Sequence, residues 1–308
     1  MDDLTGLFIP LITPFTADGE LASDALERLA HRVLDDGATG IVALGTTAEA
    51  PTLTEQERSA VLRICSRVCR ERAAPLVAGA GTNDTARSAA ELADLASYPE
   101  VRAALVVVPY YVRPGEAGVR EHFRALATGS PVPLIIYNIP YRTGQALSWQ
   151  SMAELASLPG IAGVKHAVGS VDQDTIAMMA ARPAGFSVLG GDDPYLSPML
   201  ALGASGGITA SAHVRTSDFA RLVSLWRDGQ AGAARRLGHQ LAPLSQALFA
   251  EPNPVVIKSV LHRLGQIPSP LVRLPLLPAS ADSADAALRL APAHSATDAD
   301  LTGAARVP

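Results

Sequence analysis

The stretch IAGVKHAVGS, residues 161–170, is the part of the sequence from which the fold and function are worked out. Four mostly apolar residues, 161–164, run directly into Lys165, and a short segment containing glycine follows. A short apolar run that ends in a turn signal is typical of a buried strand. A buried ammonium is costly, so a protein keeps one where it is paired or where the neutral amine acts as a nucleophile. This stretch alone leaves both interpretations open: a salt-bridged or rim lysine, and a lysine that forms Schiff bases with carbonyl substrates.

Similar short apolar runs recur along the chain and alternate with longer helical patterns. We predict strands over residues 7–12, 41–44, 75–80, 103–108, 133–137, 161–165, 186–189 and 206–209. Their ends recur about every 20 to 35 residues, which is the length of a βα unit. Eight such units form a (β/α)8 TIM barrel of the α/β class. The alternative is an open doubly wound sheet, which the absence of a GxGxxG motif disfavours.

The helical patterns carry their own start and stop signals. Ser23 and Gly37 suggest the N-cap and C-cap of the first helix, while Thr54 and Glu57 form a capping box for the second. Residues 215–265 are also helical, with breaks near Gly229 and 251–254, and they are too many for one barrel helix. We therefore expect a barrel over 1–212, a C-terminal helical region over 213–292, and a disordered tail over 293–308.

Composition limits the kind of protein that this chain can be. Of its 308 residues, 48% are apolar and 18% charged, and the net charge is −5 with no basic stripe. This argues against partners such as nucleic acid or an anionic membrane. No apolar run reaches membrane-spanning length, and the first residues lack the features of a signal peptide. Cys65 and Cys69 read as two reduced thiols on a helix. Together these features predict a cytoplasmic protein.

Polar residues follow the predicted strands at the point where each strand ends. Because the carboxyl ends of barrel strands meet at one face, we expect these side chains to converge there. Each of them also has an ordinary structural interpretation, such as capping a turn, packing at a rim or pairing at the surface. No His/Cys/Glu cluster indicates a metal, and no P-loop is present. The set consists of hydroxyls, phenols, an arginine and one lysine: Thr46, Thr47, Tyr110, Tyr111, Tyr137, Arg142 and Lys165.

At these residues the chain resembles the pyruvate-dependent class I aldolase and lyase superfamily, typified by dihydrodipicolinate synthase and N-acetylneuraminate lyase. The resemblance covers residues 5 to 278. Within the superfamily, the Thr-Thr pair, the Tyr-Tyr pair and the arginine of the RTG loop are most similar to the dihydrodipicolinate synthases. The segments that carry it are GTTAEAPTL, PYYVRP, YNIPYRTG, GVKHAVGS, LGGDD, GASGGITA, NPVVIK and LVRLPLLP.

The resemblance implies a proton-transfer system around the lysine. Lys165 would form an imine with pyruvate, which acts as an electron sink, and Tyr137 would be the general acid/base. Because a phenol normally titrates near about pH 10, Tyr137 needs help, and Thr46 and Tyr111 would supply it as a hydroxyl relay. In the family the second tyrosine of the pair comes from a neighbouring subunit. Tyr111 therefore implies a homodimer or a dimer of dimers, which would be a homotetramer.

The resemblance also implies how the substrates bind. Thr47 would hold the carboxylate of pyruvate, and Arg142 would hold the carboxylate of an aldehyde partner, for which a planar guanidinium is suited. Backbone carbonyls near Gly190 and Ile208 would orient the lysine and the enol. No metal or cofactor is implied, because the imine on Lys165 takes that role.

The implied activity is condensation of pyruvate with L-aspartate semialdehyde to 4-hydroxy-tetrahydrodipicolinate, a step of lysine biosynthesis. Two alternatives stay open: a related aldolase or dehydratase acting on a 2-oxo sugar acid or another aldehyde, and a non-catalytic barrel that binds a 2-oxo acid. Two departures from the synthase pattern bear on this choice. Ala48 stands where the family usually has glycine, and His166 stands where the synthases usually have glutamate after the lysine. The first could narrow the pyruvate pocket or only tighten its turn, and the second could change the pocket for the aldehyde.

The lysine-feedback site of the regulated synthases is poorly matched. Asn83 and Tyr110 agree with it, but Glu55, Arg58 and Arg87 stand where histidines and a glutamate would be expected. We therefore expect activity that is insensitive to lysine.

Overall fold

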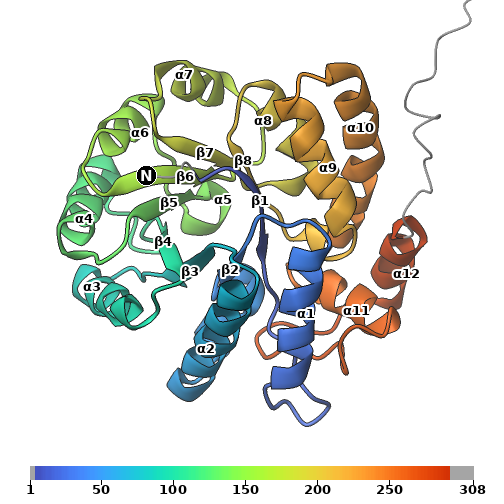
Figure 1. The fold of residues 1–308 in the computed structure, drawn as a ribbon. Helices are drawn as coiled ribbons and strands as arrows, with labels where there is room; N and C mark the ends of the chain where they lie inside the picture. The colour runs from blue at the N-terminus through green and yellow to red at the C-terminus, as the bar shows by residue number, and fades with distance from the viewer. Residues whose placement is uncertain (1–3, 292–308) are drawn as a thin grey trace, which may run out of the picture.

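A closed parallel barrel forms the centre of the molecule (Figure 1). The computed structural model describes residues 4–291, and within this range eight strands pair in sequence order until β8 meets β1. The predicted (β/α)8 TIM barrel is thus confirmed. Its strands are β1 (Gly6–Pro10), β2 (Gly40–Ala43), β3 (Leu76–Ala80), β4 (Val101–Val107), β5 (Leu134–Asn138), β6 (Ile161–His166), β7 (Ser187–Gly190) and β8 (Gly206–Ile208).

Closure of the barrel depends on small residues where its first and last strands meet. Gly6 pairs with Gly206, and a Cβ placed on Gly206 would lie only 1.9 Å from the carbonyl oxygen of Gly6. A larger residue at position 206 would force the two strands apart. Inside the barrel, inward-facing side chains pack into one buried cluster, and Tyr137 belongs to it at the end of β5.

Helices surround the strands and cover the outer core (Figure 1). The α-helices of this layer are α1 (Ser23–Asp35), α2 (Glu55–Glu71), α3 (Thr85–Ala93), α4 (Gly115–Gly129), α6 (Trp149–Ala156), α7 (Gln173–Ala181), α8 (Leu196–Ala201) and α9 (Thr216–Arg227). The single turn α5 (Pro140–Thr143) lies inside this ring, after β5 (Figure 1). Short 3-10 helices lie in the loops: η1 (Thr46–Ala48), η2 (Ala50–Thr52), η3 (Asp94–Ser97), η4 (Asp193–Tyr195) and η5 (Ser211–His213).

The helix signals in the sequence were mostly, but not entirely, correct. Thr54 and Glu57 form the predicted capping box at the start of α2, and Gly37 follows α1 in a left-handed conformation at φ +101°. The predicted N-cap at Ser23 is wrong by one residue. Ala22 occupies the cap, because its N–H is bonded to the carbonyl oxygen of Pro14 and holds the chain in a turn up to that point. Cys65 and Cys69 are free and buried on α2.

The C-terminal helices follow the barrel on one side of the molecule (Figure 1). Helix α9 packs against β1 and α8, where the eighth helix of the barrel belongs. After it come α10 (Ala231–Leu248), α11 (Val255–Arg263) and α12 (Ala281–Leu290), so the helical breaks occur near the predicted positions. The predicted disordered tail over 293–308 lies outside the described residues.

Candidate active site

Lys165 and Tyr137 are neighbours at the carboxyl ends of two adjacent strands. They face one another in the register of β5 and β6, and the lysine Nζ lies 4.3 Å from the centroid of the tyrosine ring. Both side chains are buried, with 6% and 8% of their surface exposed. Side chains alternate across a strand, so this register directs Lys165 into the barrel and its neighbour His166 outward.

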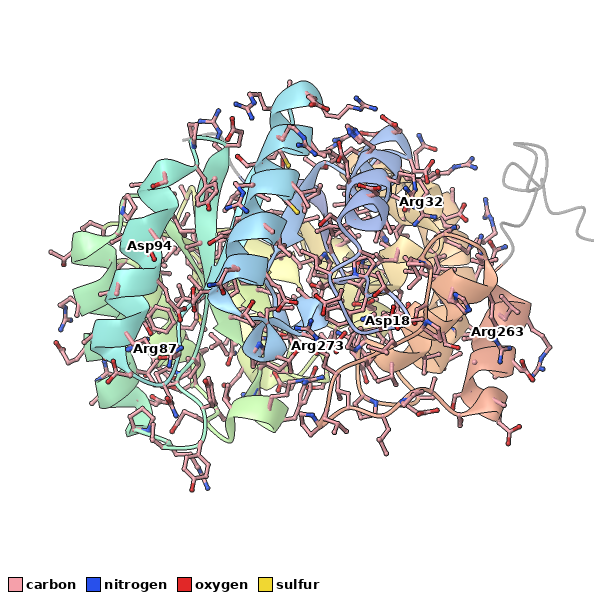
Figure 2. The ribbon with its side chains drawn as sticks, turned by 90° about the horizontal axis from the view of Figure 1, so that it is seen from below. Asp18, Arg32, Arg87, Asp94, Arg263 and Arg273 are labelled. Carbon is pink, nitrogen blue, oxygen red and sulfur yellow. The ribbon has the colours of Figure 1, made fainter. Side chains whose placement is uncertain are left out.

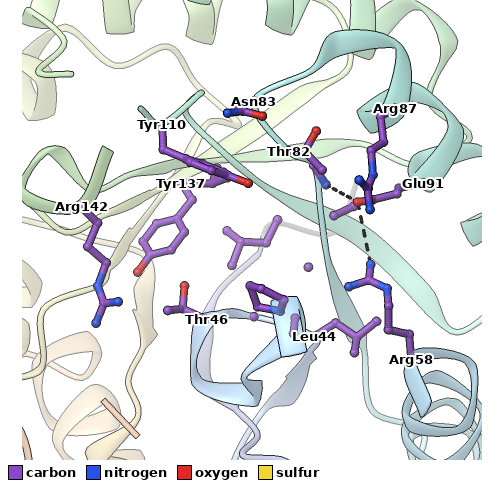
Figure 3. Close-up of a pocket in the computed structure, with 18 of the residues that line it drawn as sticks. Leu44, Thr46, Arg58, Thr82, Asn83, Arg87, Glu91, Tyr110, Tyr137 and Arg142 are labelled. Atoms are coloured by element: carbon purple, nitrogen blue, oxygen red, sulfur yellow. Dashed lines mark hydrogen bonds and ion pairs between the residues drawn. The ribbon is translucent and has the colours of Figure 1, made fainter. Parts of the chain in front are cut away.

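Most of the predicted site residues meet Lys165 in one pocket. The side chains come from strands that lie far apart in the sequence, and Figure 3 shows Tyr137 and Thr46 pointing toward the same space with Arg142 beside them. The predicted residues that line the pocket are Thr46, Thr47, Tyr137, Arg142, Lys165 and Ile208. Thr46, Tyr137 and Arg142 also line an adjoining cavity of about 600 Å³ that opens toward solvent. The lysine is therefore buried in a pocket that adjoins a cavity open to solvent.

The turn after β2 supplies the two threonines. Thr46 and Thr47 begin the short helix η1, and Thr47 is buried. The amide Nδ2 of Asn253 donates a 2.9 Å hydrogen bond to the Thr47 hydroxyl oxygen. Ala48 does not line the pocket; its N–H bonds to the carbonyl oxygen of Gly45, and its own carbonyl accepts from a buried threonine hydroxyl. Of the two expectations for Ala48, the structure supports a tighter turn, not a narrower pocket.

A glycine after β7 packs directly against the lysine. The predicted residue, Gly190, ends β7 in register with His166, and the next residue, Gly191, lines the pocket. A Cβ on Gly191 would lie 2.8 Å from Cγ and 3.0 Å from Cε of Lys165. Gly191 therefore leaves room for the lysine side chain to lie along the loop.

Tyr111 is the one predicted catalytic side chain that this chain does not bring to the lysine. It is 87% exposed and has a left-handed backbone at φ +67°, which is uncommon for a residue with a side chain. Its neighbour Tyr110 lines the outer cavity instead (Figure 3). Within one chain, Tyr111 lines neither the lysine pocket nor the outer cavity.

His166 does not face the substrate pocket: it lines neither that pocket nor the outer cavity, so the structure gives no support for a direct effect on the aldehyde site. Its Nε2 lies 3.0 Å from the Thr175 hydroxyl on α7, and burial lowers the pKa of the imidazole. The Thr175 hydroxyl donates to Asp172, so it accepts from His166, and we assign the neutral tautomer with hydrogen on Nε2. His166 thus joins β6 to α7 behind the site.

Among the pocket residues to which the sequence assigned no role in the site are Asp193 and Asn253. The carboxylate of Asp193 is buried in the lysine pocket and accepts a 2.5 Å hydrogen bond from the backbone N–H of Ser211. Burial raises the pKa of Asp193 to about 6. Asn253 was noted as part of a helix break and of the NPVVIK segment, without a role in the site. The two adjacent acids after a strand end could have suggested the first, and the NPVVIK segment of the family resemblance could have suggested the second.

Charged residues line the outer cavity away from the lysine (Figure 3). The carboxylate of Glu91 lies 3.8 Å from the Arg58 guanidinium and 3.5 Å from that of Arg87, and it also accepts from the backbone N–H of Gly81. Glu55 lies 4.0 Å from Arg58. Two guanidinium groups therefore share one carboxylate at the edge of the cavity.

Two further properties concern the whole of residues 4–291. In this range no group of three or more histidine, cysteine, aspartate or glutamate side chains is placed to hold a metal ion. No described helix has both the length and the apolar character needed to cross a membrane.

A buried lysine beside a phenol, at the carboxyl face of a (β/α)8 barrel, is the arrangement of a class I lyase. Residues 3–293 match the Dihydrodipicolinate synthetase family, and the chain belongs to this family. The 4-hydroxy-tetrahydrodipicolinate synthase of Moorella thermoacetica is 42% identical over 270 residues, which cover 88% of this chain and 91% of that protein.

Solved structures agree with this assignment. The 4-hydroxy-tetrahydrodipicolinate synthase of Methylacidiphilum fumariolicum SolV superposes with a TM-score of 0.89 at 32% identity, covering 94% of this chain and 95% of that one. The chloride-inhibited dihydrodipicolinate synthase of Acinetobacter baumannii, complexed with pyruvate, also gives a TM-score of 0.89 at 33% identity, covering 94% and 99% of the two chains.

Proposed function

We propose that this chain condenses pyruvate with L-aspartate semialdehyde to 4-hydroxy-tetrahydrodipicolinate, with loss of one water, as a cytoplasmic enzyme of lysine biosynthesis. The observation that carries this proposal is the pairing of Lys165 with Tyr137 in a pocket that also holds Thr46, Thr47 and Arg142. Membership of the synthetase family, with a curated relative of that activity at 42% identity, supports the choice of substrates.

Lys165 would begin the reaction. Its neutral amine attacks the ketone carbon of pyruvate, water leaves, and an imine forms that withdraws electrons from the neighbouring methyl group. Loss of a methyl proton gives an enamine, whose carbon attacks the aldehyde. The amine of the semialdehyde then closes the ring by displacing Lys165 from the imine carbon. No external oxidant, reductant or metal is needed for this sequence.

Tyr137 would carry the protons for these steps. Its ring lies against the lysine Nζ, and Figure 3 places Thr46 beside it. A hydroxyl chain needs a further donor, and Tyr111 is the candidate that the family resemblance supplies. Because Tyr111 is exposed and does not line the pocket of its own Lys165, it would have to serve the site of a second copy. We therefore propose a homodimer as the smallest active form, or a dimer of such dimers.

The two substrate carboxylates would bind on opposite sides of the reacting carbon. Thr47, with the N–H groups of its turn, would receive the carboxylate of pyruvate. Arg142 is exposed at the mouth of the pocket and reaches toward Tyr137 (Figure 3), so it would receive the carboxylate of the incoming aldehyde. Carbonyl oxygens near Gly190 and Ile208 would orient the lysine.

The sugar-acid alternative gains no support from the site. Ala48 and His166 were the residues that favoured it, and neither lines the lysine pocket or the outer cavity. The test is turnover of pyruvate with aspartate semialdehyde, compared with cleavage or dehydration of a panel of sugar-derived 2-oxo acids. We expect the semialdehyde reaction to have the highest kcat/KM, and a sugar acid that exceeds it would overturn the assignment.

We also propose that turnover is insensitive to lysine. A lysine entering the outer cavity would bring its ammonium groups close to Arg58 and Arg87, which already share the carboxylate of Glu91. The outer cavity thus presents positive charges at the place where the ammonium groups of a lysine ligand would need unpaired hydrogen-bond acceptors. Inhibition of the purified enzyme by lysine in the millimolar range would contradict this.

A further inference from the structure

A buried ion pair outside the pocket has no part in the reaction proposed above. The Nζ of Lys258 lies 2.7 Å from a carboxylate oxygen of Glu49, and both side chains are almost completely inaccessible to solvent. Lys165 and Lys258 are the only two lysines in the sequence. The other 23 of its 25 lysine and arginine residues are arginines. The chain therefore keeps a compact ammonium at two buried positions and uses guanidinium groups everywhere else.

Glu49 belongs to the turn that carries the two threonines. Thr46, Thr47 and Ala48 form η1, and Glu49 follows at φ +54° in the left-handed region, which is unfavourable for a residue with a Cβ. This conformation lets η2 start directly after η1. The direction of the turn, and with it the place of both threonine hydroxyls, depends on Glu49 staying in that conformation.

Three residues from the C-terminal region fix this turn from outside; we call Asn253, Lys258 and Arg273 the C-terminal anchor. Asn253 donates to the Thr47 hydroxyl, Lys258 donates to one oxygen of Glu49, and the backbone N–H of Arg273 donates to the other oxygen at 2.8 Å. The three contacts join segments more than 200 positions apart in the sequence.

Arg273 extends the anchor beyond the turn. Its guanidinium donates to the carbonyl oxygen of Thr52 and to the carboxylate of Glu57 at the start of α2. The ring of Phe15 contacts both cations, with its centroid 4.1 Å from the Lys258 Nζ and 4.3 Å from the Arg273 Cζ. Figure 2 labels Arg273 near the start of α2. The carboxylate of Glu49 is thus held on both oxygens by groups that are themselves packed in place.

We propose that Lys258 is a positioning residue for pyruvate: by holding Glu49 it keeps the turn of Thr46 and Thr47 in the geometry in which Thr47 binds the pyruvate carboxylate next to Lys165. The proposal rests on the proposed roles of Thr46 and Thr47. A buried ion pair contributes little net stability, since desolvation offsets the attraction, and replacing both partners together is often neutral. Stability alone therefore gives a weak reason for this pair, whereas a fixed turn beside the reacting lysine gives a direct one.

The test compares Glu49→Gln/Lys258→Met with the unmodified chain. The double variant removes both charges with little change of volume, so it avoids the unpaired buried charge that Lys258→Met alone would leave. The measurement is the pyruvate concentration that half-saturates borohydride trapping at Lys165, together with KM for each substrate. We expect the half-saturating pyruvate concentration and KM for pyruvate to rise about tenfold, as losing one good hydrogen-bonded contact would cause. KM for aspartate semialdehyde should change less than about twofold, because the anchor does not contact Arg142.

Arg263→Met provides the matched control. Arg263 lies on the same helix, α11, and pairs with Asp285 at the surface, away from the turn (Figure 2). It should leave pyruvate trapping unchanged. If the double variant has the unfolding midpoint and the pyruvate half-saturation of the unmodified chain, the pair does not position the site. If the unfolding midpoint falls while the pyruvate half-saturation stays unchanged, the role of the ion pair is structural and the proposal is likewise overturned. An unmodified chain that forms no adduct would refute the lysine imine itself, which is a separate outcome.

Discussion

At the scale of single residues, the site is defined by what surrounds the side chain of Lys165. The ring of Tyr137 lies on one side of it, and Gly191 lies against its methylene groups on another. The sequence could predict the first contact, because both residues end neighbouring strands and barrel strands meet at one face. It could not predict the second, because the position of the loop after β7 relative to the lysine depends on side-chain packing.

Gly191→Ala tests this packing. The backbone of Gly191 does not have a positive φ, so its conformation does not exclude alanine. The added Cβ would lie 2.8 Å from Cγ of Lys165 and 2.9 Å from Cβ of Ala167, so the lysine chain and the segment after β6 would have to shift. We expect pyruvate trapping at Lys165 to slow about 100-fold, as displacements near 1 Å at a reacting group can cause. Gly129→Ala, at the end of α4 with nothing near its Cβ, should trap at the normal rate. Equal rates for the two variants would show that the lysine does not depend on Gly191.

At the scale of elements, the sequence predicted correctly those helix boundaries that depend on neighbouring residues. The capping box at Thr54 and the helical break near Gly229 depend on neighbouring residues, and both are present. The N-cap of α1 was misplaced because a hydrogen bond from Ala22 to Pro14 sets its start. Likewise the place of His166 after the lysine suggested an effect on the aldehyde pocket, whereas strand alternation directs its side chain to α7.

The ion pair between Glu57 on α2 and Arg273 of the C-terminal anchor makes the free energy of unfolding depend on pH. Hydrogen bonding to Arg273 lowers the pKa of Glu57 from 4.5 to about 2. The folded state therefore holds this carboxylate ionised more readily than the unfolded chain does, so its stabilisation is complete above about pH 4.5 and is lost toward pH 2. At neutral pH it amounts to at most about 3 kcal/mol.

Glu57→Gln should accordingly lower the free energy of unfolding at pH 7 by about 2 to 3 kcal/mol, and the difference from the unmodified chain should fall by about half at pH 3. Urea unfolding at both pH values measures this. Glu55→Gln, which changes an exposed carboxylate in the same turn of α2, is the control and should have little effect at either pH. A difference for Glu57→Gln that stays constant with pH would exclude the ion pair as its cause.

At the scale of the whole molecule, the regular repeat of short strands was enough to predict the closed barrel and to bring most of the site together. What the repeat could not supply are contacts between distant segments, such as the bond from Asn253 to Thr47 across 206 positions. It also could not supply a side chain from another copy. Tyr111 was predicted to act across a subunit boundary, and in a single chain it is exposed and does not line the lysine pocket.

Hybrid dimers test that role of Tyr111. Tyr111→Phe should reduce turnover by about 100-fold or more, as loss of a proton-relay group does, and Lys165→Ala should be inactive. When the two variants are mixed and allowed to exchange subunits, a hybrid contains one intact lysine facing an intact Tyr111 from its partner. Random exchange should therefore restore about a quarter of normal activity. No recovery after verified exchange would mean that Tyr111 acts in its own chain or not at all.

Borohydride trapping followed by peptide mass analysis tests most directly whether Lys165 forms an imine with pyruvate. We expect one reduced pyruvate adduct on the peptide that contains Lys165 and none on the peptide that contains Lys258, the buried and ion-paired second lysine of the sequence. An unmodified Lys165 at saturating pyruvate, or an adduct found only elsewhere in the chain, would contradict it.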